Sequence, residues 1–312
     1  MRKTTLSRPV IIGIVGDSGA GKSTMASGLA QVLGPERTLI ICSDDYIKDS
    51  RKRRGELGVT AHDPAANYID ILEQHMALLR AGQAVLKPVY NHNGGVLAPA
   101  EYVQPREFII LEGLLAFSTP TLRDALDVKF FLEPQEPLRL RWKFQRDTQT
   151  SGYTLEQVMA SLDRLNRDSA RYVLPQRDCA DMVIGFYPAD DRPEETGERL
   201  NVRHILRSTL PQIDIAALFD GATDHGFEME LARDVDGRPA DALHIFGAID
   251  GAEARTMQDR LWRFIPNGRR EHPALGAFHD AHNKVRHSHP LALSQLLLTH
   301  YLLTAASGQH AN

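Results

Sequence analysis

The stretch that decides the fold is Val10-Ile11-Ile12-Gly13-Ile14-Val15-Gly16-Asp17-Ser18-Gly19-Ala20-Gly21-Lys22-Ser23-Thr24. Its apolar first part predicts a buried strand, and residues 23–33 predict a helix. The loop between them fits G-x-x-x-x-G-K-[ST], a pattern whose glycines let backbone N–H groups turn toward a phosphate. The helix N-terminus adds positive potential. A glycine-rich turn that binds nothing is the alternative, but the strand–loop–helix context favours phosphate binding.

This loop predicts the nucleotide site. Lys22 can reach the β- and γ-phosphates of ATP, and the Ser23 hydroxyl can bind Mg²⁺. ATP and Mg²⁺ are therefore the expected cofactors. The candidate nucleotide-binding residues are Gly16, Asp17, Ser18, Gly19, Ala20, Gly21, Lys22, Ser23 and Thr24.

Composition narrows the class of protein. The 312 residues are 42% hydrophobic, and the net charge of −4 gives no bulk attraction to nucleic acid or to an anionic membrane. The first nine residues leave no room for a signal-peptide core, and no apolar run is long enough to span a membrane. Two cysteines, Cys42 and Cys179, form no disulfide framework and suit a reducing cytosol. We expect a cytoplasmic protein without nucleic-acid or membrane partners.

Apolar runs alternate with helical patterns through the first two thirds of the chain. Strands are expected at residues 38–42, 85–90, 108–111, 128–132 and 182–184, and helices at 67–80, 136–150 and 155–173. Continuous apolar strands separated by helices predict an α/β fold of the P-loop NTPase type, with a mostly parallel sheet covered by helices on both faces.

The acidic, Pro/Gly-containing stretch at residues 188–197 predicts a linker or an exposed loop. We therefore expect a P-loop kinase core at residues 1–190. Residues 191–312 would form a smaller α+β region, or extend the same sheet, with strands at 202–207 and 242–246 and a helix at 290–305. Ten of the thirteen histidines lie in this part. They show no compact H-x-x-x-H pattern with a carboxylate on a helix, so metal binding there is not favoured.

Carboxylates follow two of the expected strands. Because ligands bind at the carboxyl ends of strands in open α/β sheets, Asp44 is the first candidate to accept a proton from an attacking hydroxyl, and Asp45 is the second. Glu112 ends a buried strand in the Walker-B manner and would help to hold the metal, with Ser23 and Asp44. A helix cap or a solvated loop is the alternative for each acidic residue.

Basic residues occur in two clusters. Arg51 lies in a run with Lys48, Lys52, Arg53 and Arg54, which is either a solvated loop or a loop that meets an anionic substrate. Arg139, Lys143 and Arg146 are spaced to share one helix face. They could cover the phosphates as a lid, or face solvent.

The order and spacing of several motifs resemble the phosphoribulokinase/uridine kinase family of P-loop kinases, over residues 10–187. Tyr90-Asn91-His92 is closer to the phosphoribulokinase branch than to uridine kinases, which typically have Tyr-Asp there. The matching stretches are residues 17–24, Asp44-Asp45-Tyr46, residues 58–64, residues 87–92, Glu112-Gly113-Leu114, Gln145-Arg146-Asp147 and Pro175-Gln176.

The resemblance implies that ATP phosphorylates the C1 hydroxyl of ribulose 5-phosphate in carbon fixation. It makes Asp44 the catalytic base, lets Lys22, Lys143 and Arg146 balance charge, and associates Ser23, Glu112 and Asp44 with magnesium. It also implies a homo-oligomer whose partner is a small sugar phosphate. Residues on the acceptor side are Asp45, Tyr46, Arg51, Tyr90 and His92.

The chain departs from the family pattern at Ile47, Leu115 and Ser151, where the family often has His, His and Arg on the sugar-phosphate side. Ala20 stands where plant enzymes carry a redox-regulatory cysteine, so that control is not expected. These departures leave two alternatives open. The acceptor could be uridine or another pentose phosphate, or the chain could be a nucleotide-binding regulatory protein without transfer activity.

Overall fold

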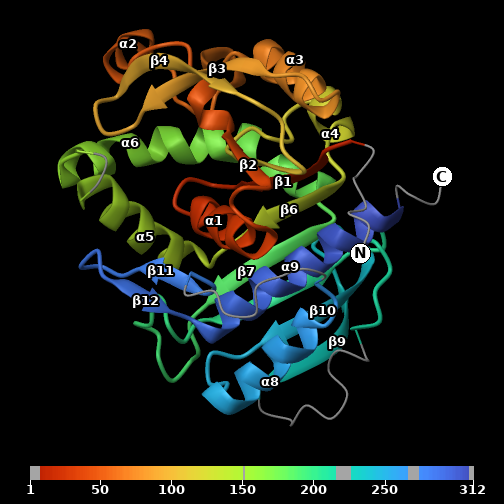
Figure 1. The fold of residues 1–312 in the computed structure, drawn as a ribbon. Coiled ribbons are helices and arrows are strands. Elements are labelled where there is room, and N and C mark those ends of the chain that lie inside the picture. The colour runs from red at the N-terminus through yellow and green to blue at the C-terminus, as the bar shows by residue number, and fades with distance from the viewer. Residues whose placement is uncertain (1–7, 150–151, 216–225, 266–273, 309–312) are drawn as a thin grey trace.

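A mixed eight-stranded sheet forms the centre of the computed structural model, which describes residues 8–149, 152–215, 226–265 and 274–308 (Figure 1). The strand order is β2-β5-β1-β6-β7-β8-β10-β9. Its strands are β1 (Val10–Gly16), β2 (Thr38–Cys42), β5 (Phe108–Gly113), β6 (Val128–Leu132), β7 (Met182–Tyr187), β8 (Asn201–Leu206), β9 (Phe227–Arg233) and β10 (Pro239–Ile245).

The first five strands in this order are parallel, and the last three pair antiparallel with their neighbours. The α/β fold with a mostly parallel sheet is therefore confirmed. β8 pairs with β7 along its whole length, so the strands after residue 190 extend the same sheet. The division into two regions at residue 190 stays a prediction.

Both faces of the sheet are buried, which explains why its central strands are apolar throughout. Ile12 and Ile14 of β1 pack in one core cluster, while Ile11 and Val15 pack in the other. The helices that contribute to the first cluster are α1 (Lys22–Leu33), α5 (Glu136–Gln149), α8 (Gly251–Trp262) and α9 (His289–Gly308), and those that contribute to the second are α3 (Ile69–Arg80) and α4 (Pro120–Asp124).

Two short hairpins stand apart from the main sheet. The strand expected at residues 85–90 forms β3 (Val85–Asn91) with β4 (Val96–Val103) instead of joining the central sheet. A second hairpin joins β11 (Ala277–His279) to β12 (Val285–His287). The remaining helices are α2 (Arg51–Leu57) and α6 (Leu155–Asp168), and the helix expected to continue to residue 173 changes at residue 169 to a π-helical turn.

The C-terminal helix α9 packs directly on the P-loop helix α1. Gly28 of α1 permits this close approach, because a Cβ atom there would lie 2.0 Å from Nε2 of Gln295. Oε1 of the Gln295 side chain accepts a hydrogen bond from the Gly276 N–H at 2.8 Å. Helix α9 is thereby held against α1, the helix that follows the phosphate loop.

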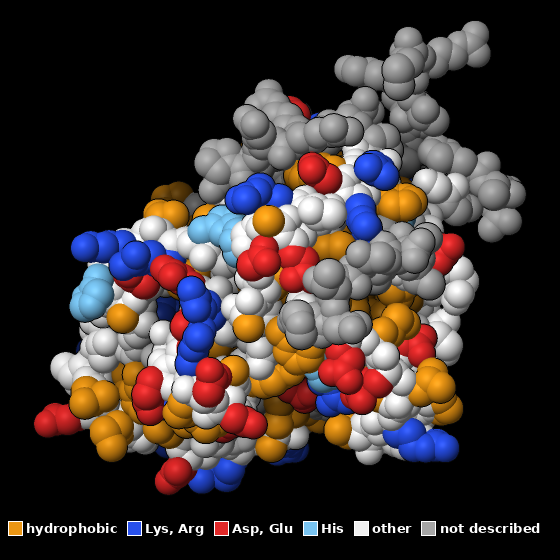
Figure 2. Space-filling view, turned by 90° about the horizontal axis from the view of Figure 1, so that it is seen from below, with side chains coloured by type: hydrophobic (Ala, Val, Ile, Leu, Met, Phe, Trp, Pro, Cys, Tyr) orange, Lys and Arg blue, Asp and Glu red, His pale blue; other side chains and the backbone are white. Residues whose placement is uncertain are grey.

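Acidic and basic side chains are interspersed on the face shown in Figure 2, and on its described part neither sign forms a continuous field. Within the described residues, no helix combines the length and the apolar character needed to cross a bilayer.

Candidate active site

The phosphate loop connects β1 to α1 as the sequence predicts. Gly19 and Gly21 adopt φ values of +86° and +87°, which L side chains rarely adopt. Lys22 is 8% exposed, and its Nζ donates to the carbonyl oxygens of Gly16 at 3.0 Å and Asp17 at 3.1 Å. A cationic nitrogen is thus fixed beside a loop that is shaped for an anion.

Asp17 is cross-linked to distant parts of the chain. Its Oδ1 lies 3.1 Å from Nε2 of His62, and its Oδ2 accepts a hydrogen bond from the Ser169 hydroxyl at 2.8 Å. Burial raises the pKa of Asp17, but His62 and Arg139 outweigh burial and hold it well below its usual range. Asp17 therefore stays ionised and ties the start of the loop to residues 62 and 169.

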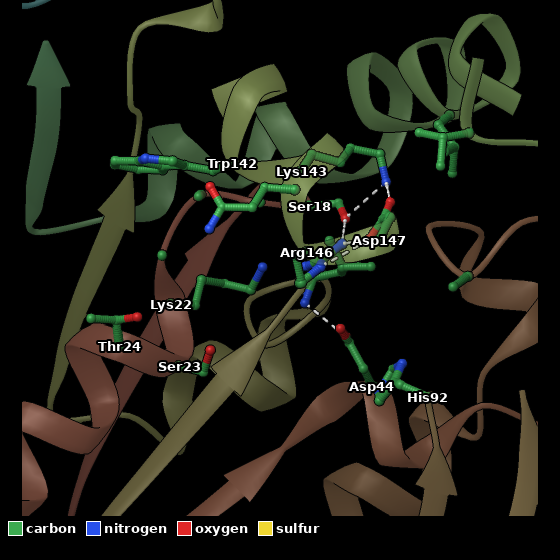
Figure 3. A pocket seen from close by; sticks show the side chains of 18 of the residues that line it. Ser18, Lys22, Ser23, Thr24, Asp44, His92, Trp142, Lys143, Arg146 and Asp147 are labelled. Carbon is green, nitrogen blue, oxygen red and sulfur yellow. Dashed lines mark hydrogen bonds and ion pairs between the residues drawn. The ribbon is translucent and has the colours of Figure 1, made fainter. Parts of the chain in front are cut away.

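Two carboxylates stand at the carboxyl ends of neighbouring strands. Oδ1 of Asp44, just after β2, accepts a hydrogen bond from the Leu114 N–H at 3.0 Å. Glu112 of β5 is 7% exposed, and burial raises its pKa to about 7 against the opposing charge of Lys22. Both side chains line the cavity that also contains Lys22 and Ser23, and Figure 3 shows Asp44 facing this cavity.

Asp45 and Tyr46 differ from Asp44, because neither lines this cavity. Asp45 accepts from Lys87 Nζ at 2.6 Å and from the Tyr90 N–H at 3.1 Å, so both of its oxygens are engaged. Tyr46 is fully buried, and its hydroxyl bonds to His75. The contacts of Asp45 hold β3 beside Asp44, while Tyr46 bonds to α3 through His75. A direct contact of either residue with the acceptor stays a prediction.

Helix α5 covers the phosphate loop with the three cations that share one face. Arg139 donates to the Ser18 carbonyl oxygen at 2.7 Å. Arg146 donates to the Ser18 hydroxyl at 2.8 Å, and Lys143 Nζ lies 3.4 Å from the same oxygen (Figure 3). Of the two arrangements left open by the sequence, the structure has the lid over the loop.

Asp147 orients two of these cations. Its carboxylate accepts from Lys143 at 2.6 Å and from Arg146 at 2.7 Å. Burial raises the pKa of Asp147, but Arg146 and Lys143 lower it further than burial raises it. Sequence reasoning gave Asp147 no role, although it lies in one of the motif stretches.

One cavity of about 1090 Å³ contains the loop, the lid and both carboxylates. Beyond Asp44, its wall is polar and cationic. Beyond Lys22 in the opposite direction, its wall is aromatic. The polar end is lined by Arg51, Arg54, His62, Tyr90, His92, Tyr153 and Arg164.

Two residues of the basic run, Arg51 and Arg54 of α2, line the cavity. The other three, Lys48, Lys52 and Arg53, do not. The Arg51 guanidinium lies 3.8 Å from the centre of the Tyr153 ring and donates to the His92 carbonyl oxygen at 2.5 Å. Arg54 is 7% exposed and donates to the Tyr90 hydroxyl at 3.0 Å. Ser151 lies outside the described residues.

Comparison with known proteins decides the family. The family model described as "Phosphoribulokinase / Uridine kinase family" matches residues 11–192, more than half of the chain. The chain belongs to the phosphoribulokinase/uridine kinase family. The P-loop, Asp44, Glu112 and the α5 lid all lie inside the matched residues.

Relatives within this family are about one third identical to the chain over the residues that align. A phosphoribulokinase of Synechocystis is 37% identical over 217 residues, which cover 70% of this chain and 65% of that protein. The wheat chloroplast phosphoribulokinase is 34% identical, covering 69% of this chain and 58% of the relative. The chain thus spans about three fifths of the length of these relatives. A uridine kinase of Alkaliphilus metalliredigens is 32% identical, over 57% of this chain and 88% of that protein.

The fold of the chain is similar to that of a solved structure. A phosphoribulokinase from Rhodobacter spheroides aligns with a TM-score of 0.57 and 18% identity, covering 83% of this chain and 97% of the other. At this identity the likeness concerns the fold alone, and it includes much of the chain after residue 192.

Proposed function

We propose that the protein transfers the γ-phosphoryl group of ATP to the C1 hydroxyl of ribulose 5-phosphate, giving ribulose 1,5-bisphosphate in carbon fixation. The observation that carries the proposal is the placement of Asp44 in one cavity with the phosphate loop, facing a cationic end that suits a phosphorylated acceptor. The names of the phosphoribulokinase relatives support the choice of acceptor.

The mechanism assigns one task to each group. The Leu114 N–H holds one oxygen of Asp44 and so orients the carboxylate. The carboxylate aligns the acceptor hydroxyl and takes its proton. Lys22, Lys143 and Arg146 stabilise the negative charge of the phosphoryl group in transit, and Asp147 keeps the last two in position. Catalysis is then mainly positioning and electrostatic stabilisation.

Magnesium is part of the proposal, and the donor set fits it. Mg²⁺ prefers oxygen ligands and is usually bound through one or two carboxylates together with substrate phosphates. The carboxylates of Glu112 and Asp44 and the hydroxyl of Ser23 are such ligands, and all three line the cavity. When bound, the ion would neutralise charge on the β- and γ-phosphates.

Replacing Glu112 with glutamine is expected to raise the Mg²⁺ concentration needed for half-maximal activity by about tenfold, because a carboxylate near the ion is lost. A magnesium titration at saturating ATP measures this. Glu228→Gln, an exposed change on β9, serves as the control. An unchanged magnesium requirement in Glu112→Gln would refute the metal role of Glu112.

The cationic end of the cavity is suited to the acceptor's own phosphate. Arg54 is buried, and no carboxylate among the described residues lies within ion-pair distance of it. Buried charges are normally paired, so an anion is expected there. Arg164 of α6 lines the same end, and the part of the chain that the structure describes gives its side chain no ion pair or hydrogen bond. Arg54 and Arg164 would supply positive charge on the sugar-phosphate side, where this chain has Ile47, Leu115 and Ser151 in place of the family's usual His, His and Arg.

Replacing Arg164 with alanine is expected to raise KM for ribulose 5-phosphate by at least about tenfold while leaving KM for ATP within about twofold. The reason is the loss of one charge-assisted contact to the acceptor phosphate. Arg167→Ala is the matched control, because Arg167 is exposed on the same helix and does not line the cavity. Equal KM values in the two variants would remove Arg164 from the acceptor site.

An ADP-release assay with ribulose 5-phosphate, ribose 5-phosphate and uridine tests the acceptor. We expect turnover with ribulose 5-phosphate to exceed that with the other two. Preference for uridine would favour the uridine kinase alternative. ATP binding without any phosphorylated product would favour a regulatory protein. The presence of Lys22, Asp44 and Glu112 in one cavity supports transfer instead.

Two further expectations belong to this proposal. A cytoplasmic location is supported by Cys42 and Cys179, which are both unpaired thiols. Assembly into a homo-oligomer rests only on the resemblance to the family, and sedimentation of the purified protein would test it.

A further inference from the structure

The end of the cavity away from Asp44 is an aromatic slot that the transfer mechanism does not use. Trp142 comes from α5, Phe186 from β7 and Phe278 from β11, and all three line this end. In Figure 3, Trp142 and Thr24 lie on the opposite side of Lys22 from Asp44 and His92. The other apolar side chains of the slot are Met25, Leu200, Val202 and Leu291.

The β11–β12 hairpin closes one side of this slot, and it is anchored to the lid helix. The side-chain amides of Gln145 and Gln149 donate to the carbonyl oxygens of Asp280 and Ala281, each at 2.7 Å. Figure 1 shows the hairpin next to α5. Because α5 also carries Lys143 and Arg146, the hairpin is fixed relative to the phosphate loop.

A second contact joins the hairpin to the segment after β7. A Cβ atom on Gly197 would lie 2.3 Å from the Phe278 ring, so the backbone there runs against the ring. Trp142 Nε1 donates to the Thr196 carbonyl oxygen at 2.8 Å. Trp142 and Phe278, which both line the cavity, therefore contact neighbouring residues of one segment.

The position of the slot defines what can occupy it. A nucleotide whose terminal phosphates rest on residues 16–24, with the γ-phosphate toward Asp44, must extend away from Asp44. Its far end is a flat, largely apolar base, and aromatic side chains are good partners for such a ring. The cationic end lies on the Asp44 side, where the γ-phosphate and the acceptor are placed by the proposed function.

We propose that the β11–β12 hairpin forms a wall of the base subsite for ATP, with Phe278 contacting the purine ring. This inference rests on the proposed use of ATP. It assigns a role to residues 277–287, which lie beyond the matched residues 11–192. The C-terminal part of the chain is then a component of the nucleotide site rather than a separate module.

The test compares binding of ATP with binding of inorganic tripolyphosphate, which has the phosphates but no base, by calorimetry. Phe278→Ala is expected to weaken ATP binding by about tenfold or more, because stacking on a base contributes about 1–3 kcal/mol. Binding of tripolyphosphate should stay within about twofold. Phe278→Tyr, which keeps an aromatic ring, should restore most of the ATP affinity.

Val285→Ala is the matched control, since Val285 lies on the partner strand β12, is exposed and does not line the cavity. It should bind both ligands like the original protein. Unchanged ATP affinity in Phe278→Ala would overturn the proposal. An equal loss of both ligands would also overturn it, since the effect would then lie at the phosphates.

The two proposals fail in different ways. If the original protein bound ATP but phosphorylated no sugar, the proposed function would fail while the base subsite stood. If it bound tripolyphosphate as tightly as ATP, the base subsite would fail regardless of the acceptor.

Discussion

Replacing Asp44 with asparagine is expected to lower kcat for phosphoryl transfer by about 10²–10⁴-fold, the usual contribution of a positioned general base. The amide keeps the shape of the side chain and can still accept from the Leu114 N–H. It cannot take the proton of the acceptor hydroxyl. Steady-state kinetics at saturating ATP and ribulose 5-phosphate measure the change.

ATP affinity is the companion measurement for this variant. The nucleotide is held by the phosphate loop and Lys22, so Asp44→Asn should bind ATP within a few-fold of the original protein. Asp70→Asn removes an exposed carboxylate on α3 and should leave kcat unchanged. A kcat of Asp44→Asn within tenfold of normal would exclude Asp44 as the base.

Replacing Asp234 with alanine is expected to destabilise the fold by about 3–5 kcal/mol, the range for breaking a buried ion pair by removing one partner. Its side chain is 1% exposed and accepts from Arg177 at 2.7 Å and from Arg207 at 2.8 Å. Both arginines are themselves nearly buried. The substitution would leave Arg207 without its carboxylate partner, while Arg177 would keep only its ion pair with Glu133.

The effect should reach across the sheet, because Arg207 also donates to the carbonyl oxygens of Arg177, Asp178 and Ala180. Urea unfolding measures the free energy of unfolding. Asp236→Ala, an exposed change in the same turn, should alter it by no more than about 1 kcal/mol. Equal values for the two variants would contradict the structural role of Asp234.

Local patterns were enough to predict the phosphate loop and the parallel part of the sheet. Residues 10–24 combine an apolar strand, a glycine-rich turn and a helix start, and each feature depends only on near neighbours. Asp44 and Glu112 could be placed in the site because the carboxyl ends of parallel strands meet at one edge. The structure places both in the cavity.

Long-range contacts account for what the sequence did not predict. Arg164 is one of several charged residues on α6. It differs from Arg167 in lining the cavity, which depends on how α6 packs against the rest of the fold. The strands of the β11–β12 hairpin have three residues each, too short for a periodic pattern. Asp45 resembles Asp44 in sequence, but its pairing with Lys87 depends on a hairpin 42 residues away.

The most direct test of the central claim follows the reaction of ATP and ribulose 5-phosphate by ³¹P NMR. The account predicts that the γ-phosphate signal disappears while ADP and a new phosphomonoester at C1 of the sugar appear in equal amounts. It predicts neither product with Asp44→Asn over the same period. Formation of ADP and inorganic phosphate without a new sugar ester would contradict the account, because the cavity would then activate water rather than the sugar hydroxyl.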